Sequence, residues 1–411
     1  MIDSASLPAW PLLAAALALL SPWGASLLAS DDETSRSAGL LPLIAVLVAL
    51  IGYAATGFAL HFGGIGILID HPDVTALVWE WTPLSSGDLS FWGVAGWMGF
   101  GMAEAQTPLA ALLFLTTLPL AATASLLALL TLWRQISPAA GVFLAALMAL
   151  LLAPLVGNWT QAGGWLMHLG ESIGAGDGYL DFGGASFYLL AGGVALAALL
   201  AGRGSRRSDD AAFLGLTPVW GAGLLAVGGV GWIIASPLHL WIGVSPAQAA
   251  LNGLLALAAG GLIGLTYGWA ALGAPDAGWT ARSAAAGWTA ALAALAWMSP
   301  LQSMLVGAVA AWLFILAVWI IDEFLGWRDP GDIFAMFGLP AIWGVLAVGF
   351  FAPTPGQFKA QIIGVASIFL ASFFVTSVFL ATMLLFSHLT ARRVQPAPLP
   401  ESDPDAILPE L

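Results

Sequence analysis

The chain has 411 residues, of which 60% are hydrophobic and only 8% are charged, and its formal net charge is −13. A soluble domain contains about 25% charged residues, so the composition excludes an ordinary soluble protein and predicts an integral membrane protein. The negative charge comes from loops and the C-terminal tail, and the sequence has no basic features typical of a nucleic-acid partner. The absence of cysteine excludes a disulfide framework and thiol metal sites.

Hydropathy predicts an all-α polytopic membrane protein with about eleven membrane-spanning helices. The residues before the first apolar run include an aspartate and no basic residue, whereas a cleaved signal peptide usually has a basic leader. We therefore expect the first run to be a retained span, with cleavage of residues 1–29 as the alternative. The predicted ranges are 10–29, 39–63, 108–133, 138–157, 181–202, 213–235, 247–268, 282–298, 301–325, 332–352 and 358–388.

The ten basic residues test the orientation of these spans. With the N-terminus outside, only Lys359 falls on the outer side, and the C-terminus is cytoplasmic. The short loops and the missing cysteines suggest a bacterial inner membrane. The nine residues expected on the cytoplasmic side are Arg36, Arg134, Arg203, Arg206, Arg207, Arg282, Arg328, Arg392 and Arg393.

Two segments outside the spans have a distinctive composition. Residues 70–107 are rich in acidic residues and tryptophan, and a re-entrant or surface helix is considered around residues 91–101. Its tryptophans are read as anchors at the membrane interface, or as an aromatic vestibule that attracts cations. The tail is rich in proline and acidic residues. We expect a transmembrane domain at 1–393 and a disordered cytoplasmic tail at 394–411.

The stretch at 326–352, GWRDPGDIFAMFGLPAIWGVLAVGFFA, begins with a polar turn and then runs uncharged for about one membrane thickness. Asp332 is the expected N-cap of this helix. Glycines at 338, 344 and 349 predict close approach of a neighbouring helix. The stretch resembles a signature of the ammonium transporter family (Amt/Mep/Rh), D-x-F-x-x-H-G-x-x-G. The family's pore histidine position is Phe337 in this chain.

The run at 181–192, DFGGASFYLLAG, resembles the family's D-F-A-G-G-T-x-x-H. Asp181 and the glycines match. The family's first pore histidine falls on Tyr188 when the glycine pairs are aligned, or on Leu189 without a gap. The resemblance implies that Asp181 helps to form the cation site electrostatically, and the alternative is a structural helix cap.

One further segment carries the resemblance. The run GAGLLAVGGVGWIIAS is similar to the family's G-T-G-L-L-W-F-G-W-F-G-F-N-A-G-S. It implies that Trp232 belongs to the outer gate and that Ser236 is the cation-binding serine. Gln161 stands where the family has a vestibule tryptophan. The resemblance as a whole implies a 5+5 inverted repeat plus a C-terminal helix, with a pathway at the repeat interface, and a homotrimer in the lipid bilayer.

None of the five histidines falls where the pore histidine pair would be, and their spacing has no metal-ligand signature. Neither a metal nor a cofactor is predicted. Imidazoles relay protons near neutral pH, whereas Tyr188 can only hydrogen-bond an amine, and Leu189 and Phe337 can do neither. An altered mechanism is therefore expected. The alternative is that the aromatic side chains at 187, 188 and 337 fill the lumen by packing.

Two classes of function follow from these observations. The first is a transporter or channel for ammonium, ammonia or a related small cation or gas. The alternative is a non-conducting member that acts as a sensor, a binding protein or a structural subunit with an unidentified protein partner. An enzyme is not predicted, because the chain lacks a catalytic triad pattern and metal or nucleotide motifs. An open lumen beside Tyr188 and Phe337 favours transport, and a packed lumen does not.

Overall fold

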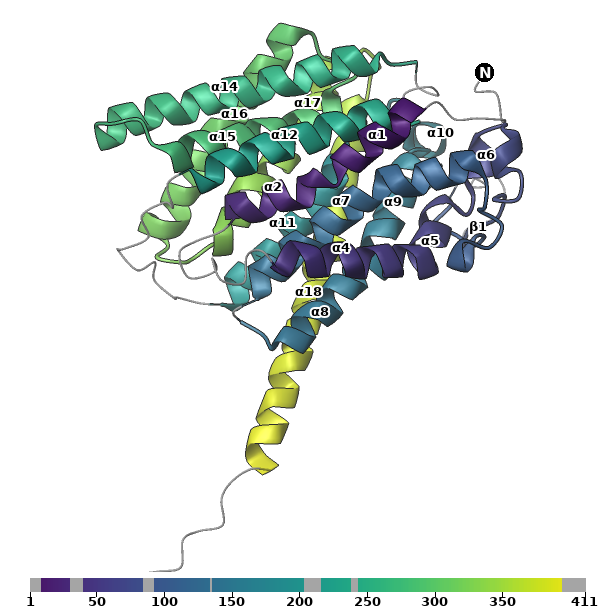
Figure 1. The fold of residues 1–411 in the computed structure, drawn as a ribbon, viewed down its shortest axis with the longest axis horizontal. Helices are drawn as coiled ribbons and strands as arrows, with labels where there is room; N and C mark the ends of the chain where they lie inside the picture. Colours follow the sequence, from purple (N-terminus) through teal and green to yellow (C-terminus); the bar gives the residue numbers. More distant parts are fainter. Residues whose placement is uncertain are drawn as a thin grey trace, which may run out of the picture.

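The computed structural model describes residues 9–29, 40–83, 92–133, 135–202, 216–237 and 243–393. These residues form a bundle of helices with one short two-stranded hairpin (Figure 1). The predicted tail at 394–411, and the basic residues expected at 36, 134, 203, 206 and 207, lie outside the described residues.

The first half of the bundle runs from α1 to α11. Proline follows a Ser or Thr N-cap at the start of α7 and of α8, which agrees with the preference of proline for the first helical turn. The elements are α1 (Ala9–Ala18), α2 (Leu20–Ala29), α4 (Leu40–Gly52), η1 (Tyr53–Gly57), α5 (Phe58–Phe62), α6 (Ile65–Leu68), η2 (Pro72–Val74), β1 (Glu80–Trp81), β2 (Ala95–Gly96), η4 (Phe100–Met102), α7 (Pro108–Leu132), α8 (Pro138–Leu147), η5 (Met148–Leu152), α9 (Ala153–Gln161), α10 (Leu169–Ile173) and α11 (Ala185–Ala201).

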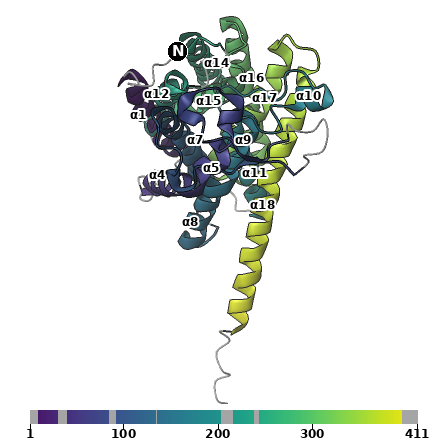
Figure 2. The same ribbon diagram turned by 90° about the vertical axis from the view of Figure 1, so that its right-hand side faces the viewer.

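The second half ends in a long helix that extends away from the bundle (Figures 1 and 2). It contacts both α11 and α17. The elements are α12 (Thr217–Ala235), α14 (Pro246–Leu272), α15 (Ala277–Ala291), η6 (Leu292–Ala294), α16 (Pro300–Trp319), η7 (Ile320–Phe324), η8 (Pro330–Asp332), η9 (Phe334–Gly338), α17 (Leu339–Phe351) and α18 (Gln357–Arg393).

Helices occupy every predicted span. Among the described residues, nine helical segments are long and apolar enough to cross a membrane, while α11 is a shorter apolar helix and α15 has 15 residues. The all-α polytopic fold is confirmed, and the count of eleven spans stays a prediction. Around residues 91–101 the structure has no α-helix among the described residues. In its place β2 pairs antiparallel with β1, Glu80 opposite Gly96.

The bundle has two ends that carry different chemistry. We call the end with β1 and β2 the hairpin end; Lys359 lies there and donates to the carbonyl of Ile173. We call the opposite end, where Arg282 pairs with Asp332, the arginine end. Helix α11 runs from the hairpin end toward the arginine end, and the η9–α17 segment runs in the opposite direction. This antiparallel pair positions the residues described below.

The two segments cross in backbone contact at Gly192 and Gly338. A Cβ atom built on Gly192 would lie 2.6 Å from the Cα atom of Gly338, and the reverse distance is also 2.6 Å. On the same helix, a Cβ on Gly344 would lie 1.9 Å from the carbonyl oxygen of Ala290. The prediction that glycines of this helix admit close neighbours is therefore confirmed.

Replacing Gly338 with alanine is expected to push α11 and the η9–α17 segment apart, because the backbone on the other side cannot yield as a side chain would. We expect a clear decrease in the thermal unfolding midpoint of the detergent-solubilised protein. Gly223 is the matched control, since a Cβ there meets nothing within 4 Å. Equal midpoints for Gly338→Ala and Gly223→Ala would contradict this account of the crossing.

Candidate functional site

Tyr188 on α11 and Phe337 in η9 face each other inside the bundle. Their ring centroids lie 5.6 Å apart at an interplanar angle of 31°. Tyr188 is 3% exposed, and Leu189 and Phe337 are 0% exposed. Phe337 belongs to a π turn, a form of helix that occurs often at functional sites. The structure thus brings together one residue from each of the two segments that resemble pore helices.

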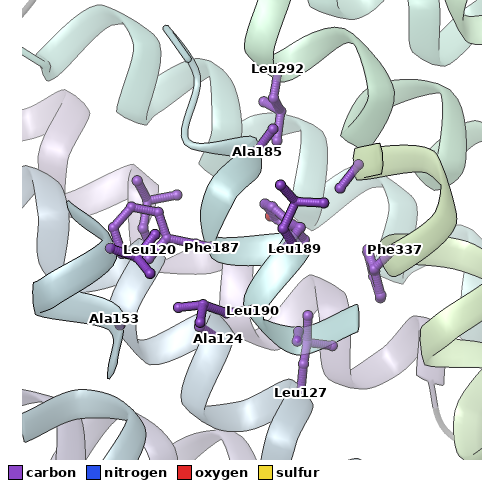
Figure 3. Close-up of a cluster of buried hydrophobic side chains, with 14 of the residues drawn as sticks. Leu120, Ala124, Leu127, Ala153, Ala185, Phe187, Leu189, Leu190, Leu292 and Phe337 are labelled. Carbon is purple, nitrogen blue, oxygen red and sulfur yellow. The ribbon is translucent and has the colours of Figure 1, made fainter. Parts of the chain in front are cut away.

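The surroundings of this ring pair are filled with apolar side chains (Figure 3). They come from α7, α9, α11, η6 and η9 and are all buried. In a well-packed interior few voids are larger than a water molecule, so this conformation has a packed interior beside the pair. The residues labelled in the figure are Leu120, Ala124, Leu127, Ala153, Ala185, Phe187, Leu189, Leu190, Leu292 and Phe337.

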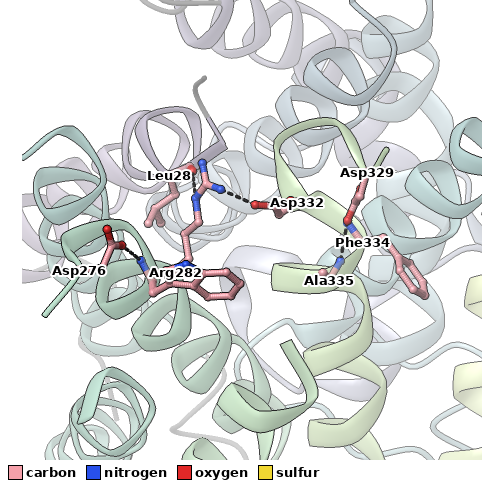
Figure 4. Close-up of polar contacts among 8 residues, drawn as sticks. Leu28, Asp276, Arg282, Asp329, Asp332, Phe334 and Ala335 are labelled. Atoms are coloured by element: carbon pink, nitrogen blue, oxygen red, sulfur yellow. Dashed lines mark hydrogen bonds and ion pairs between the residues drawn. The ribbon is translucent and has the colours of Figure 1, made fainter. Parts of the chain in front are cut away.

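Both pore-like segments are capped by aspartate. Asp181 accepts hydrogen bonds from the backbone N–H groups of Ala185 and Ser186, at 2.9 and 2.8 Å. At the other segment Asp329 accepts from Phe334 and Ala335, at 3.2 and 2.8 Å (Figure 4). Such bonds satisfy the free N–H groups of a first helical turn. The prediction that Asp332 is the cap is therefore wrong, and Asp329 has that role.

Asp332 instead pairs with the buried guanidinium of Arg282 on α15 (Figure 4). The left-handed backbone at Gly331 and Asp332, with φ of 67° and 52°, turns the carboxylate toward α15. Arg282 also donates through Nε to the carbonyl of Leu28, at 3.0 Å. Arg282, expected at the cytoplasmic start of the span 282–298, thus ties α2, α15 and η8 together inside the bundle.

The expected vestibule residues belong to two helix ends. Trp232 is buried near the end of α12, where its ring lies 6.3 Å from that of Phe182, the residue after Asp181. Ser236 ends the same helix, and its backbone N–H bonds to the carbonyl of Trp232 at 2.9 Å. Gln161 is the last residue of α9, and its Nε2 atom has no hydrogen-bond partner among the described residues.

A polar cluster that the sequence did not single out lies at the hairpin end. Asn158 on α9 donates through Nδ2 to a carboxylate oxygen of Glu80 at 2.8 Å and to the carbonyl of His61 at 3.2 Å. The His61 ring nitrogen Nδ1 is bonded to the hydroxyl of Tyr53 at 2.8 Å. Burial raises the pKa of Glu80, against smaller effects of Asn158 and His168 that lower it.

An asparagine and a histidine within apolar helices are the sequence signal that could have found this cluster. Within the described residues no group of three or more His, Cys, Asp or Glu side chains is arranged to hold a metal ion. The residues of the polar cluster are therefore described by their hydrogen bonds and not as metal ligands.

Comparisons of the sequence with known proteins point to one family. The model of the Ammonium Transporter Family matches residues 9–397. Ammonium transporter Amt2 of Archaeoglobus fulgidus is 25% identical over 360 residues, which cover 84% of this chain and 71% of that protein. An ammonium transporter of Bacillus subtilis is 26% identical over 275 residues, which cover 61% of this chain and 64% of that protein.

Two solved structures have the same fold. A protein described as "Sensor Amt Protein" has a TM-score of 0.70 at 19% identity, with 94% of this chain and 93% of that chain covered. Candida albicans Mep2 has a TM-score of 0.72 at 21% identity, with 92% and 84% covered. At these identities the structural likeness concerns the fold alone.

Proposed function

Because the chain belongs to the ammonium transporter family, we propose that it is a membrane transporter or channel for ammonium, ammonia or a related small molecule, with a mechanism that does not use a pair of pore histidines. The observation that carries the proposal is the match of the family's model to residues 9–397. The buried contact between Tyr188 and Phe337 counts toward the alternative, because transport favours an open lumen there. The two segments that resemble the family's pore helices meet at these rings, and the proposed change of mechanism rests on the absence of histidine at both positions.

The ring pair determines what chemistry remains possible. Phenylalanine neither donates nor accepts a proton, and an ordinary phenol, with a pKa of about 10, exchanges protons slowly near neutral pH. Tyr188 retains a hydroxyl that can hydrogen-bond a passing amine. We therefore propose that the pair closes the pathway sterically and that conduction requires the rings to separate, without a proton relay at this point.

We assign the entrance to the residues at the helix ends. Trp232 presents an aromatic ring, and aromatic faces attract small cations. Ser236 and Gln161 add groups that can hydrogen-bond a hydrated cation. Asp181 contributes a negative charge while it caps α11. Of these, Trp232 and Asp181 are linked through Phe182, and that link supports a single entrance.

We further propose a homotrimer in the lipid bilayer with the N-terminus outside, in a bacterial inner membrane. Large apolar side chains exposed on the outward faces of α14, α16 and α18 support contact with lipid or with another copy. Examples are Leu262, Trp312 and Phe374, which are all exposed. Closed cyclic symmetry is common among homo-oligomers.

A second candidate function rests on the packed interior. The rings of Tyr188 and Phe337 are in contact and almost completely buried, which favours a non-conducting protein that binds or senses a ligand. A structural neighbour described as a sensor has the same fold. In this reading the pore segments are retained for stability, and an unidentified partner protein receives the signal.

Uptake of labelled methylammonium into proteoliposomes separates the two candidates. We expect the unaltered chain to take up more label than protein-free liposomes. Phe337→His combined with Tyr188→His, or with Leu189→His, is expected to increase uptake further, because an imidazole pair adds proton exchange. No uptake until the histidines are introduced would overturn the transporter proposal and favour the sensing function.

A further inference from the structure

The polar cluster at the hairpin end connects the surface segment with the helices beneath it. Glu80 on β1 is bonded to Asn158 on α9, and Asn158 is bonded to the backbone of His61 on α5. Asn158 and His61 are completely buried, and Glu80 is half-buried. Polar side chains at such depth within apolar helices are expensive unless they are paired or have a function.

The orientation of the Asn158 amide is fixed by its partners. Its nitrogen faces two acceptors, a Glu80 carboxylate oxygen and the His61 carbonyl, so the opposite assignment would place oxygen against oxygen. The amide oxygen is buried and has no hydrogen-bond partner among the described residues. Asn158 therefore holds Glu80 with one end and presents a free acceptor with the other.

His61 leaves a second buried atom without a partner. Its Nδ1 is bonded to Tyr53, and its Nε2 makes no hydrogen bond to a described residue. The ring lies against Gly157, where a Cβ atom would come within 2.1 Å of the imidazole carbon Cε1. A glycine at this position of α9 is thus required for the histidine to fit beside Asn158.

The side chain of Glu80 also packs directly against glycines, as His61 does against Gly157. A Cβ atom on Gly93 would lie 1.9 Å from one carboxylate oxygen, and a Cβ on Gly64 would lie 3.1 Å from the side chain. Within the described part of the chain no Lys or Arg is paired with Glu80, and the titratable neighbour is His168. The described residues therefore offer no fixed cation to neutralise this carboxylate when it is ionised.

Three tryptophans, Trp92, Trp159 and Trp165, pack against one another next to Gly93, and we call them the tryptophan wall. The rings of Trp92 and Trp165 are stacked with centroids 5.4 Å apart, and Trp159 meets Trp165 at 6.0 Å. The backbone N–H of Trp165 donates to the carbonyl of Gly93 at 2.8 Å, which ties the tryptophan wall to the glycine that packs against Glu80. The indole N–H of Trp92 is buried without a partner among the described residues, and a co-bound water would satisfy it.

We propose that Glu80, Asn158 and His61, beside the tryptophan wall, bind one small N–H cation of the ammonium or methylammonium type. A carboxylate, an amide oxygen and an imidazole nitrogen are acceptors, and an ammonium ion offers several N–H donors with one positive charge. Aromatic faces add a cation–π attraction. The site uses residues other than Trp232, Ser236 and Gln161, and it rests on the proposed function only for the choice of ligand.

Equilibrium binding of labelled methylammonium to the full chain in detergent micelles tests the site without any need for conduction. We expect saturable binding that Glu80→Gln weakens by about tenfold or more, because glutamine keeps the shape but removes the charge. Glu104→Gln is the matched control: Glu104 is an exposed carboxylate in the same outer segment, and its removal is expected to leave binding unchanged. Both variants must elute as the unaltered protein does.

Competition identifies the ligand chemistry. Unlabelled ammonium chloride is expected to displace the label, whereas tetramethylammonium, which has no N–H donor, is expected to displace it weakly. Binding that survives in Glu80→Gln but is lost in Trp232→Leu would overturn the site, and so would equal displacement by sodium chloride. In either case uptake by the unaltered chain in proteoliposomes would leave the proposed function standing.

Discussion

Phe337→Ala is expected to increase methylammonium uptake into proteoliposomes by about tenfold. The substitution removes one ring of the pair that closes the space between α11 and η9. An aromatic pair contributes about 0.5–1.5 kcal/mol beyond the burial of its area, and a barrier lowered by about 1.4 kcal/mol is tenfold in rate. The apolar space left by the ring is suited to a neutral amine or ammonia.

The matched control for this prediction is Phe350→Ala. Phe350 lies on α17, the helix that continues η9, and it is exposed on the outside of the bundle. Phe350→Ala removes a phenyl ring, as Phe337→Ala does, but leaves the contact between Tyr188 and Phe337 unchanged. Uptake is therefore expected to stay at the level of the unaltered chain. Unchanged uptake in both variants would show that the ring pair does not limit conduction.

The positions of the helices were predictable because their signals are local. An apolar run of about twenty residues indicates a span wherever it folds. The starts are also local: Ser137 and Ser299, each followed by proline, accept hydrogen bonds from the first turns of α8 and α16. Neither signal depends on what a distant part of the chain does.

The N-terminal cap of the η9–α17 segment could not be predicted from neighbouring residues alone. Two aspartates, Asp329 and Asp332, are close enough to the helix start to be its cap. The left-handed turn at Gly331 decides between them, because it turns Asp332 toward Arg282 and leaves Asp329 beside the free N–H groups. The partner of Asp332 lies 50 residues away in the chain, so the sequence could not indicate it.

The candidate sites depend on such long-range contacts even more. Asn158 meets Glu80 across 78 residues and His61 across 97. The sequence left Tyr188 and Leu189 as alternatives for one pore position, and only the fold shows that the ring of Tyr188 meets Phe337. Patterns of one chain identify which segments cross the membrane, whereas the side chains that meet are determined by how those segments pack.

Arg282→Met is expected to lower the stability of the protein more than Glu80→Gln or Glu104→Gln does. The methionine retains an apolar stem, but Asp332 is left buried at the arginine end with its neighbour Asp329 and without its cation. Removal of one partner from a buried ion pair costs about 3–5 kcal/mol, since the remaining charge is uncompensated. The Leu28 carbonyl also loses its donor. The measurement is the thermal unfolding midpoint in one detergent.

A double substitution separates the ion pair from the packing of the arginine stem. Arg282→Met together with Asp332→Asn removes both charges, so the midpoint is expected to rise toward that of the unaltered protein, as a double-mutant cycle detects. Lys359→Met is the control: Lys359 is exposed, and its ammonium group donates to the carbonyl of Ile173. Its effect is expected within about 1 kcal/mol. If Arg282→Met resembled Lys359→Met, the pair would be incidental. α2, α15 and η8 would then be held together by their apolar contacts alone.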